Sequence, residues 1–196
     1  MRLVYGWGIN DANYVVQPTV NGKRVICPFY QTWRNMLQRC YCEKYHEMRP
    51  TYRDCEVCSE WKSFMAFKAW METQDWEGKQ LDKDLIGDKL YSPETCCFVE
   101  GWLNSIFNDH GSATGDYPVG VSLNKETGKF YSYLNVLGVR KHNGLFDTPE
   151  EASDAYRTTK LNHVQGLMAN YPDQRIKQAV LNKAQTLYGE TPCVSC

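Results

Sequence analysis

The segment GLFDTPEEASDAY, residues 144–156, decides how the C-terminal half of this 196-residue chain folds. Thr148 precedes Pro149, and Glu151 follows Thr148 by three residues. A threonine at the cap, a proline at the first helical position and a glutamate at the third form a capping box, which marks a helix start. The sequence therefore predicts that a strand ending at Phe146 leads directly into a helix.

Upstream of this helix, apolar and polar residues alternate as in strands that are buried on one side. Strands are expected over residues 119–123, over 130–136, and from Arg140 to Phe146. In the second of these, the two predicted faces are Phe130, Ser132, Leu134 and Val136 on one side, and Tyr131, Tyr133 and Asn135 on the other. The pattern predicts a three-stranded antiparallel sheet packed on a helix, with a further helix after Pro172.

The turn-forming segment HGSATGDYP, residues 110–118, is predicted to be a linker. Three parts are expected: an N-terminal domain over 1–110, the sheet and helix over 111–165, and a C-terminal helix and tail over 166–196. In the first part, helical spacing predicts helices over 28–45 and 59–73, the second capped by Ser59. Two short strands and a helix, a ββα outline, are expected over 78–107. The predicted fold class is α+β.

Composition limits the classes of function. The chain has 22 Lys and Arg against 23 Asp and Glu, a net charge of -1, so a DNA-binding surface must be local. No stretch approaches the roughly 20 apolar residues that cross a bilayer, and the N-terminus lacks the pattern of a signal peptide. We expect a soluble, cytoplasmic protein without a membrane partner; the oligomeric state stays open. Its nine cysteines are expected to be reduced thiols, which favours metal binding.

Four motifs between residues 27 and 108 carry a resemblance: RCY (39–41), VCSEW (57–61), LDKD (81–84) and YSPETC (91–96). In this order and spacing they resemble the phage-borne HNH-type homing endonucleases. The resemblance implies a ββα fold that holds one catalytic Mg²⁺ or Mn²⁺ ion, and it implies catalytic roles for Asp82, Lys83, Asp84 and Asn104, with Asn108 as an alternative to Asn104.

The position of the catalytic base departs from the family pattern. Active members have a histidine after the aspartate, whereas this chain has Lys83. A lysine is a poor base unless desolvation lowers its pKa, although it can stabilise an anionic transition state. His46 and His110 are the alternative candidates for the base. Solvated carboxylates on a simple hairpin are the competing interpretation of Asp82 and Asp84.

A structural zinc ion is the second metal that the N-terminal part predicts. Cys40, Cys58 and Cys96 match the family's cysteine positions, and Cys55 forms a CxxC pair with Cys58. Zinc requires four tetrahedral nitrogen or sulfur donors. The candidate ligands are Cys40, Cys55, Cys58 and Cys96, with Cys42, Cys97 or His46 as other possible fourth donors. Buried thiols without metal are the competing interpretation.

A second resemblance spans residues 119 to about 160. The motifs GVS (120–122), GKF (128–130), GLFDTPEEA (144–152) and AY (155–156) are similar to the Apetala-type, or ethylene-response-factor, DNA-binding domain. That fold lays a three-stranded sheet in the major groove. The residues that the resemblance places on the DNA are Ser122, Tyr131, Tyr133, Asn135, Arg140 and Lys141. Ordinary solvent-facing strand residues are the competing interpretation.

Together the two resemblances predict a phage protein, a metal-dependent endonuclease that cleaves double-stranded DNA. In this hypothesis the C-terminal sheet docks in the major groove and the ββα unit cuts. The alternative is a nuclease-derived protein without catalysis that binds DNA or inhibits a host protein. The absent histidine and the near-zero net charge motivate that alternative.

Overall fold

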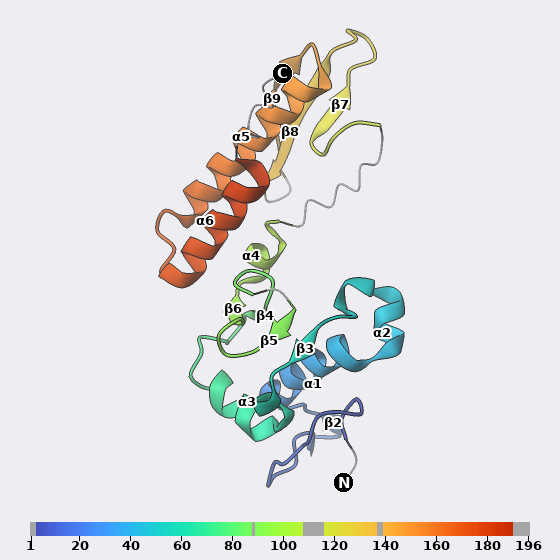
Figure 1. Ribbon diagram of the computed structural model, residues 1–196, viewed down its shortest axis with the longest axis vertical. Coiled ribbons are helices and arrows are strands. Elements are labelled where there is room, and N and C mark those ends of the chain that lie inside the picture. Colours follow the sequence, from blue (N-terminus) through green and yellow to red (C-terminus); the bar gives the residue numbers. More distant parts are fainter. Residues whose placement is uncertain (1–2, 88, 108–115, 137–138, 190–196) are drawn as a thin grey trace. The chain divides into compact units, whose positions relative to one another are not determined.

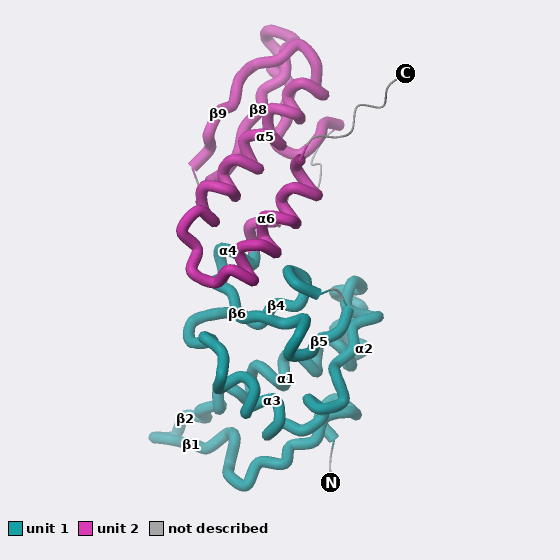
Figure 2. The backbone as a smooth tube through the Cα atoms, turned by 60° about the vertical axis from the view of Figure 1, so that its left-hand side comes forward, with its two compact units in different colours: residues 1–104 teal, residues 105–196 magenta. Residues whose placement is uncertain are grey.

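The computed structural model describes residues 3–87, 89–107, 116–136 and 139–189 (Figure 1). The chain forms two compact units, unit 1 over residues 1–104 and unit 2 over 105–196 (Figure 2). Both combine helices with strands, which confirms the mixed class predicted from the sequence. The predicted boundary between residues 110 and 111 lies outside the described residues, as do Asn108, His110 and the cysteines at 193 and 196. None of the helices described is long and apolar enough to span a bilayer.

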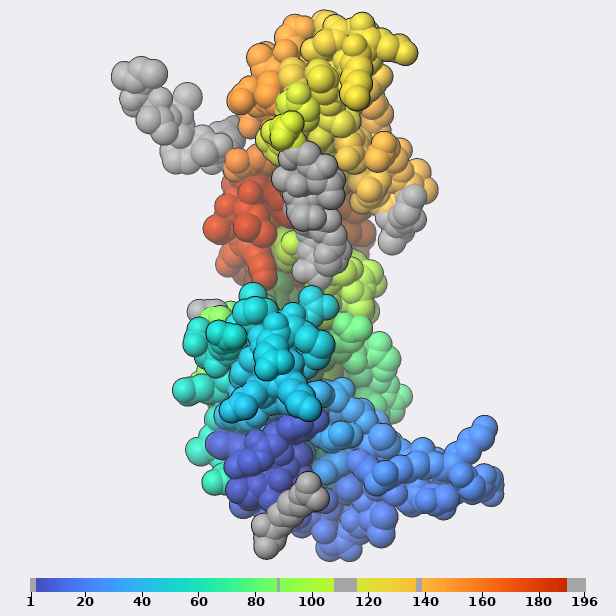
Figure 3. Space-filling model, turned by 90° about the vertical axis from the view of Figure 1, so that its right-hand side faces the viewer, coloured from blue at the N-terminus to red at the C-terminus, as the bar shows by residue number. Residues whose placement is uncertain are grey.

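Unit 1 is built from short elements. They are β1 (Thr19–Val20), β2 (Lys23–Arg24), α1 (Pro28–Tyr41), α2 (Glu43–Met48), the 3₁₀ turn η1 (Pro50–Tyr52), β3 (Glu56–Val57), the 3₁₀ turn η2 (Ser59–Lys62), α3 (Phe64–Met71), β4 (Gln80–Asp82), β5 (Leu90–Tyr91), β6 (Cys97–Val99) and α4 (Gly101–Ser105). The helix expected over residues 28–45 is interrupted at Cys42, which has an extended backbone. Figure 3 shows the β1–β2 segment, in blue, projecting from this unit.

The cap predicted for the second helix is wrong. Ser59 begins the 3₁₀ turn η2, and the hydroxyl of Ser63 accepts the backbone N–H of Ala66 at 3.0 Å to cap α3. Ser63 in turn donates to Asp11 at 2.6 Å, and Asp11 also accepts the N–H of Met65 at 2.9 Å. The helix start is thus fixed by a residue more than fifty positions away, which local sequence does not reveal.

Aromatic side chains from distant segments form the core of unit 1. Trp33 of α1 is fully buried, and its indole N–H donates to the carbonyl of Trp61 at 2.7 Å. Phe64 packs against Trp33 with a ring-centroid separation of 5.5 Å. Trp61 also contacts Trp70, at 4.5 Å between centroids. The tryptophans and phenylalanines at helical spacing are therefore packing residues.

The ββα outline exists with a different strand pairing. β4 pairs with β6 in antiparallel fashion, Asp82 lying opposite Cys97, and α4 follows β6. Between them in the sequence, β5 pairs in parallel with β3 and not with β4. Immediately after β4 the chain turns, because Leu85 N–H donates to the Asp82 carboxylate at 2.8 Å and Gly87 N–H to the Lys83 carbonyl at 2.9 Å.

Unit 2 follows the sequence pattern closely. Its elements are β7 (Val121–Leu123), β8 (Phe130–Val136), β9 (Val139–Phe146), α5 (Pro149–Met168) and α6 (Gln174–Tyr188), and the strands form one antiparallel sheet in that order. The capping box is confirmed: Glu151 N–H donates to the Thr148 hydroxyl at 3.2 Å, and Thr148 N–H donates to the Glu151 carboxylate at 3.3 Å. Figure 1 shows α5 lying along the sheet with α6 beside it.

Buried side chains recur every fourth residue on both helices of unit 2. On α5 they are Ala152, Tyr156, Lys160, Val164 and Met168, and on α6 they are Ile176, Val180, Ala184 and Tyr188. Next to β7, Gly120 lies close to α5, since a Cβ atom there would be 2.2 Å from the Tyr156 ring. This contact and the buried stripe of α5 hold one face of the sheet against the helix.

Candidate functional site

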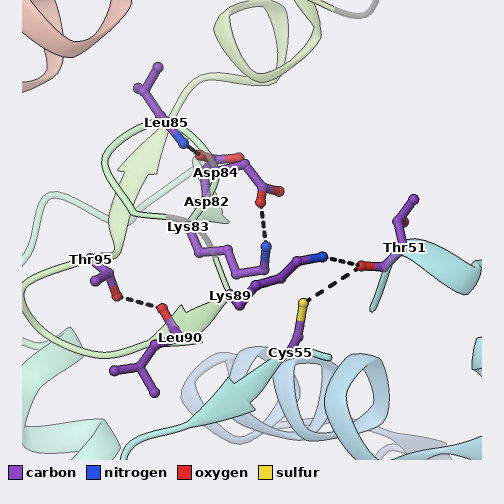
Figure 4. Close-up of polar contacts among 9 residues, drawn as sticks. All are labelled: Thr51, Cys55, Asp82, Lys83, Asp84, Leu85, Lys89, Leu90 and Thr95. Atoms are coloured by element: carbon purple, nitrogen blue, oxygen red, sulfur yellow. Dashed lines mark hydrogen bonds and ion pairs between the residues drawn. The ribbon is translucent and has the colours of Figure 1, made fainter. Parts of the chain in front are cut away.

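The end of β4 carries the residues that the nuclease resemblance singled out (Figure 4). Lys83 is 4% exposed, and its ammonium group donates to the Asp84 carboxylate. The same ammonium lies over the rings of Tyr52 and Tyr91, at 5.7 and 5.6 Å from their centroids. Arg39 lies over the Tyr52 ring as well, at 5.9 Å, so two cations share one group of tyrosines.

Lys83 is held in its charged form. Burial by itself lowers the pKa of a lysine, but the hydrogen bond and the charge of Asp84, together with Cys55 and Tyr52, raise the pKa of Lys83 above its ordinary value. A general base must be unprotonated near the working pH. Lys83 does not meet that requirement. Its ammonium lies over the rings of Tyr52 and Tyr91, where it contributes to the fold of unit 1.

Asp82 is the last residue of β4, and Lys83 follows it at the start of the turn. Asp82 is half-buried and caps the turn through Leu85. On its side of the strand lies Gln80, whose amide oxygen accepts a hydrogen bond from the side chain of Asn104 in α4 at 2.8 Å. Because Gln80 and Asp82 are two residues apart in β4, Asp82 and Asn104 are associated with the same face of that strand.

His46, the first alternative candidate for the base, forms a hydrogen bond within unit 1. Its ring nitrogen Nε2 is 2.7 Å from the carbonyl oxygen of Arg39 at the end of α1. That hydrogen bond links α2 to α1, so the histidine side chain helps to hold the two helices together. The other candidate histidine, at position 110, lies outside the described residues.

The four predicted zinc ligands come from three regions of unit 1. Cys40 lies in α1, Cys55 and Cys58 flank β3, and Cys96 precedes β6. Burial, with the neighbouring Cys55 as a smaller cause, raises the pKa of Cys40 to about 12, and burial raises that of Cys96 to about 12 as well. Burial also raises the pKa of Cys58.

With their pKa values raised, the thiols of Cys40, Cys58 and Cys96 favour the protonated form unless a metal ion is present. Cys55 donates a long hydrogen bond, 3.9 Å, to the carbonyl of Thr51 (Figure 4). Among the described residues no three His, Cys, Asp or Glu side chains are arranged to hold a metal ion. Zinc bound by Cys40, Cys55, Cys58 and Cys96, or with Cys42 or Cys97, stays a prediction.

In unit 2 the sheet face that points away from α5 gathers most of the predicted DNA-binding residues. The cross-strand pairs on it are Ser122 with Tyr131, Tyr131 with the exposed Leu145, Tyr133 with His142, and Asn135 with Arg140. The pairs on the opposite face include Ser132 and Leu134, which are buried against the helix. We call the first set, namely Ser122, Tyr131, Tyr133, Asn135, Arg140 and His142, the sheet face.

Aromatic contacts fix the side chains of the sheet face. The guanidinium carbon of Arg140 lies 4.1 Å from the centroid of the Tyr133 ring. Tyr131 and His142 meet edge to face at 5.3 Å between centroids. The Tyr131 hydroxyl accepts a hydrogen bond of 2.7 Å from the side-chain amide of Asn124, in the β7–β8 turn. The result is a continuous polar and aromatic surface with an exposed cation at one end.

Lys141 does not lie on the sheet face. It is opposite Leu134, which is 3% exposed, and its charge acts on His163 of α5. Arg140 and Lys141 are consecutive strand residues, so only one of them can point to each side. His142 takes the place expected for Lys141. Alternation counted from Arg140 would have identified His142, but the resemblance did not include it.

A β-bulge explains why alternation fails further along β9. The register shifts between Ser132 and Tyr133, whose partners are Gly144 and His142, so Asn143 is left without an opposite residue. The Asn143 side-chain amide donates to the buried Ser132 hydroxyl at 3.1 Å. Gly144 has φ +141°, a backbone conformation that glycine adopts readily. Because of the bulge, His142 and Leu145 lie opposite Tyr133 and Tyr131 although they are three residues apart in β9.

The two units differ in what they offer a ligand. The cations of unit 1 at β4 are engaged with carboxylate and tyrosine side chains, whereas the sheet face of unit 2 presents Arg140, Asn135 and His142 exposed. Comparisons with family models, with curated proteins and with solved structures find no match for this chain.

Proposed function

We propose that this chain binds double-stranded DNA through the sheet face of unit 2. The observation that carries the proposal is the stacking of the exposed Arg140 guanidinium on Tyr133, directly across from the exposed Asn135. A guanidinium offers a planar set of N–H donors that suits phosphate oxygens and the guanine edge. Stacking restricts its rotamers, so less conformational entropy is lost when it binds.

The charge of the three strands is compatible with a polyanion. Strands β7, β8 and β9 contain Arg140, Lys141 and no acidic residue. The β7–β8 turn adds Lys125, Glu126 and Lys129, of which Lys129 pairs with Asp147 at 2.9 Å. Arg140 is the cation that the strands place on the sheet face, and no carboxylate of the three strands opposes a phosphate there.

The test is the affinity of the full chain for duplex DNA, measured by fluorescence anisotropy at a fixed salt concentration. Arg140→Ala should weaken binding about tenfold or more, because one arginine contact contributes on the order of 1–3 kcal/mol. Lys141→Ala is the matched control: it removes the same charge from the next residue on the other face, and its effect should stay below about threefold. Equal losses for both variants would contradict binding by the sheet face.

Metal-dependent DNA cleavage is a second candidate function, favoured by the antiparallel pair β4–β6 followed by α4. Asp82 and Asn104 are associated with one side of that arrangement. Mg²⁺ takes one or two carboxylates beside phosphate and water oxygens. Asp82 fits this requirement as a single carboxylate ligand, whereas Asp84 fits poorly because Lys83 already neutralises it.

Cleavage is tested with supercoiled plasmid in the presence of Mg²⁺, Mn²⁺ or a chelator. Asp82→Asn is the informative variant, because asparagine keeps an oxygen for the Leu85 N–H and loses only the charge. Metal-dependent nicking that this variant lacks would support an endonuclease. Intact but retarded plasmid would leave a DNA-binding protein without catalysis. Plasmid that is neither cut nor retarded would overturn both proposals and favour the host-protein alternative.

A further inference from the structure

The hairpin formed by β1 and β2 stands apart from the core of unit 1. Its base is anchored where Cys27 N–H donates to the carbonyl of Val16, at 2.9 Å. The strands pair Thr19 with Arg24 and Val20 with Lys23. Asn21 and Gly22 form the turn with φ of 50° and 74°, the two positive values of a type I′ turn. The Asn-Gly turn therefore favours formation of this hairpin from its local sequence.

Every residue from 18 to 25 is exposed, including Val20 at 49% and Val25 at 48% (Figure 3). Pro18, Val20 and Val25 share one face, because they are spaced by two along paired strands. A two-stranded hairpin is marginally stable alone in water, since it buries little apolar surface. Nothing in the described part of unit 1 covers this face, which fits a segment that gains contacts from a partner.

The charge of the hairpin identifies the chemistry of that partner. Neither the Lys23 nor the Arg24 side chain forms a hydrogen bond or an ion pair with any described residue. From residue 12 to residue 42 the chain has no aspartate or glutamate, while it has Lys23, Arg24, Arg34 and Arg39. The pairing register sends Lys23 and Arg24 to opposite faces of the hairpin. A cation on each face suits a partner that is anionic on both sides.

We propose that the β1–β2 hairpin is an arm that enters a groove of duplex DNA and contacts the phosphates of its two walls through Lys23 and Arg24. The major groove, about 12 Å wide, admits a two-stranded β-ribbon, and its walls are lined with phosphates. The exposed valines contact the groove surface in this arrangement. The inference rests on the proposed function, since it assigns a second contact to the same DNA.

The salt dependence of DNA binding by the full chain tests the arm. Each phosphate contact contributes a slope of about -0.9 to log K against log [salt]. The variant Lys23→Ala/Arg24→Ala should reduce the magnitude of the slope by about 1.8 and weaken binding at least about tenfold at low salt. The matched control is Lys44→Ala/Arg53→Ala, which removes two exposed cations that lie beside Glu43 and Asp54. Its slope should equal that of the unchanged protein.

The outcomes separate the arm from the proposed function. If the unchanged protein binds DNA and the Lys23/Arg24 variant has the same slope, the arm is overturned and the sheet face stands. If the unchanged protein does not bind duplex DNA, the arm and the proposed DNA binding by the sheet face are both contradicted. Concentration-dependent dimerisation that the variant abolishes, with DNA binding unchanged, would identify a second copy of the chain as the partner and overturn the proposal. Thermal unfolding of the variant should match that of the unchanged protein, because both side chains are exposed.

Discussion

In each unit a cationic side chain lies over a tyrosine ring, but one of these cations is buried and the other is exposed. In unit 1 the Lys83 ammonium lies over Tyr52 and Tyr91 and is 4% exposed, and Asp84 neutralises it. In unit 2 the Arg140 guanidinium lies 4.1 Å from the Tyr133 centroid and is exposed. The same interaction stabilises the fold in one place and orients a donor toward solvent in the other. Burial and ion pairing, rather than the residue type, decide whether a cation is available to a ligand.

The largest expected effect comes from removing the support beneath Tyr133. The carbonyl of Gly120 accepts the Tyr133 N–H at 2.9 Å, and Gly120 has φ +78° against the Tyr156 ring. Gly120→Ala adds a Cβ atom 2.2 Å from that ring, in a backbone conformation that alanine disfavours. We expect a loss of about 2–4 kcal/mol in the free energy of unfolding, measured by urea denaturation.

Gly128→Ala is the matched control for that prediction. Gly128 has φ +72°, and its Cβ position has nothing within 4 Å, so only the backbone strain of about 1–2 kcal/mol applies. The difference between the two variants isolates the contact of the sheet with α5. Equal losses would mean that this contact does not support the sheet face.

The next prediction compares Lys83 and Arg140 by their contributions to stability and to DNA affinity. Lys83→Ala removes a buried stem and its ion pair, which should cost about 2 kcal/mol of unfolding free energy. Arg140→Ala removes an exposed side chain and should change stability by less than about 0.5 kcal/mol. The order should reverse for DNA affinity, where Arg140→Ala has the larger effect.

Lys83→Met shows whether packing or charge stabilises unit 1. Methionine keeps most of the stem between the tyrosines, and the partner Asp84 is 52% exposed, so its unpaired charge remains solvated. A loss well below that of Lys83→Ala would assign the stabilisation to packing. Equal losses would assign it to the charge on the rings.

The difference between the units also explains what the sequence predicts. The capping box of Thr148 and Glu151 and the alternation along β8 are local patterns, and both are confirmed in unit 2. In unit 1 the elements are only a few residues long and are fixed by distant partners, such as Asp11 with Ser63 and β5 with β3. Local periodicity does not report on such pairs, so the cap at Ser59 was predicted wrongly and the pairing of β3 with β5 was not predicted.

The candidate sites follow the same division. Alternation identified Tyr131, Tyr133 and Asn135 on one surface, but the bulge at Asn143 and the side of Lys141 depend on the pairing register of β9. Lys160 is a further example: it is 8% exposed in the stripe of α5, with its ammonium 5.7 Å from the Tyr188 ring centroid. A charged residue at a core position violates the apolar pattern, and local sequence does not reveal its tertiary contact with a tyrosine.

The smallest effect tests which side of β9 Lys141 occupies. Burial, then the charges of Lys141 and Lys160, lower the pKa of His163 below its ordinary value. The unfolded chain therefore takes up this proton at a higher pH than the folded chain. As the pH falls below about 6.5, the free energy of unfolding should decrease, whereas above that pH His163 contributes no dependence. Because His163 is partly solvated, the contribution is roughly a few tenths of a kcal/mol.

His163→Gln should remove this contribution, and Lys141→Gln should reduce it, in urea denaturation compared at pH 7.5 and pH 5. Each variant is measured against the unchanged protein at both values, since carboxylates elsewhere titrate equally in all three. An unchanged pH difference in Lys141→Gln would place that ammonium away from α5. It would then be free to join Arg140 in facing the DNA, and the distinction between the two sides of β9 would fail.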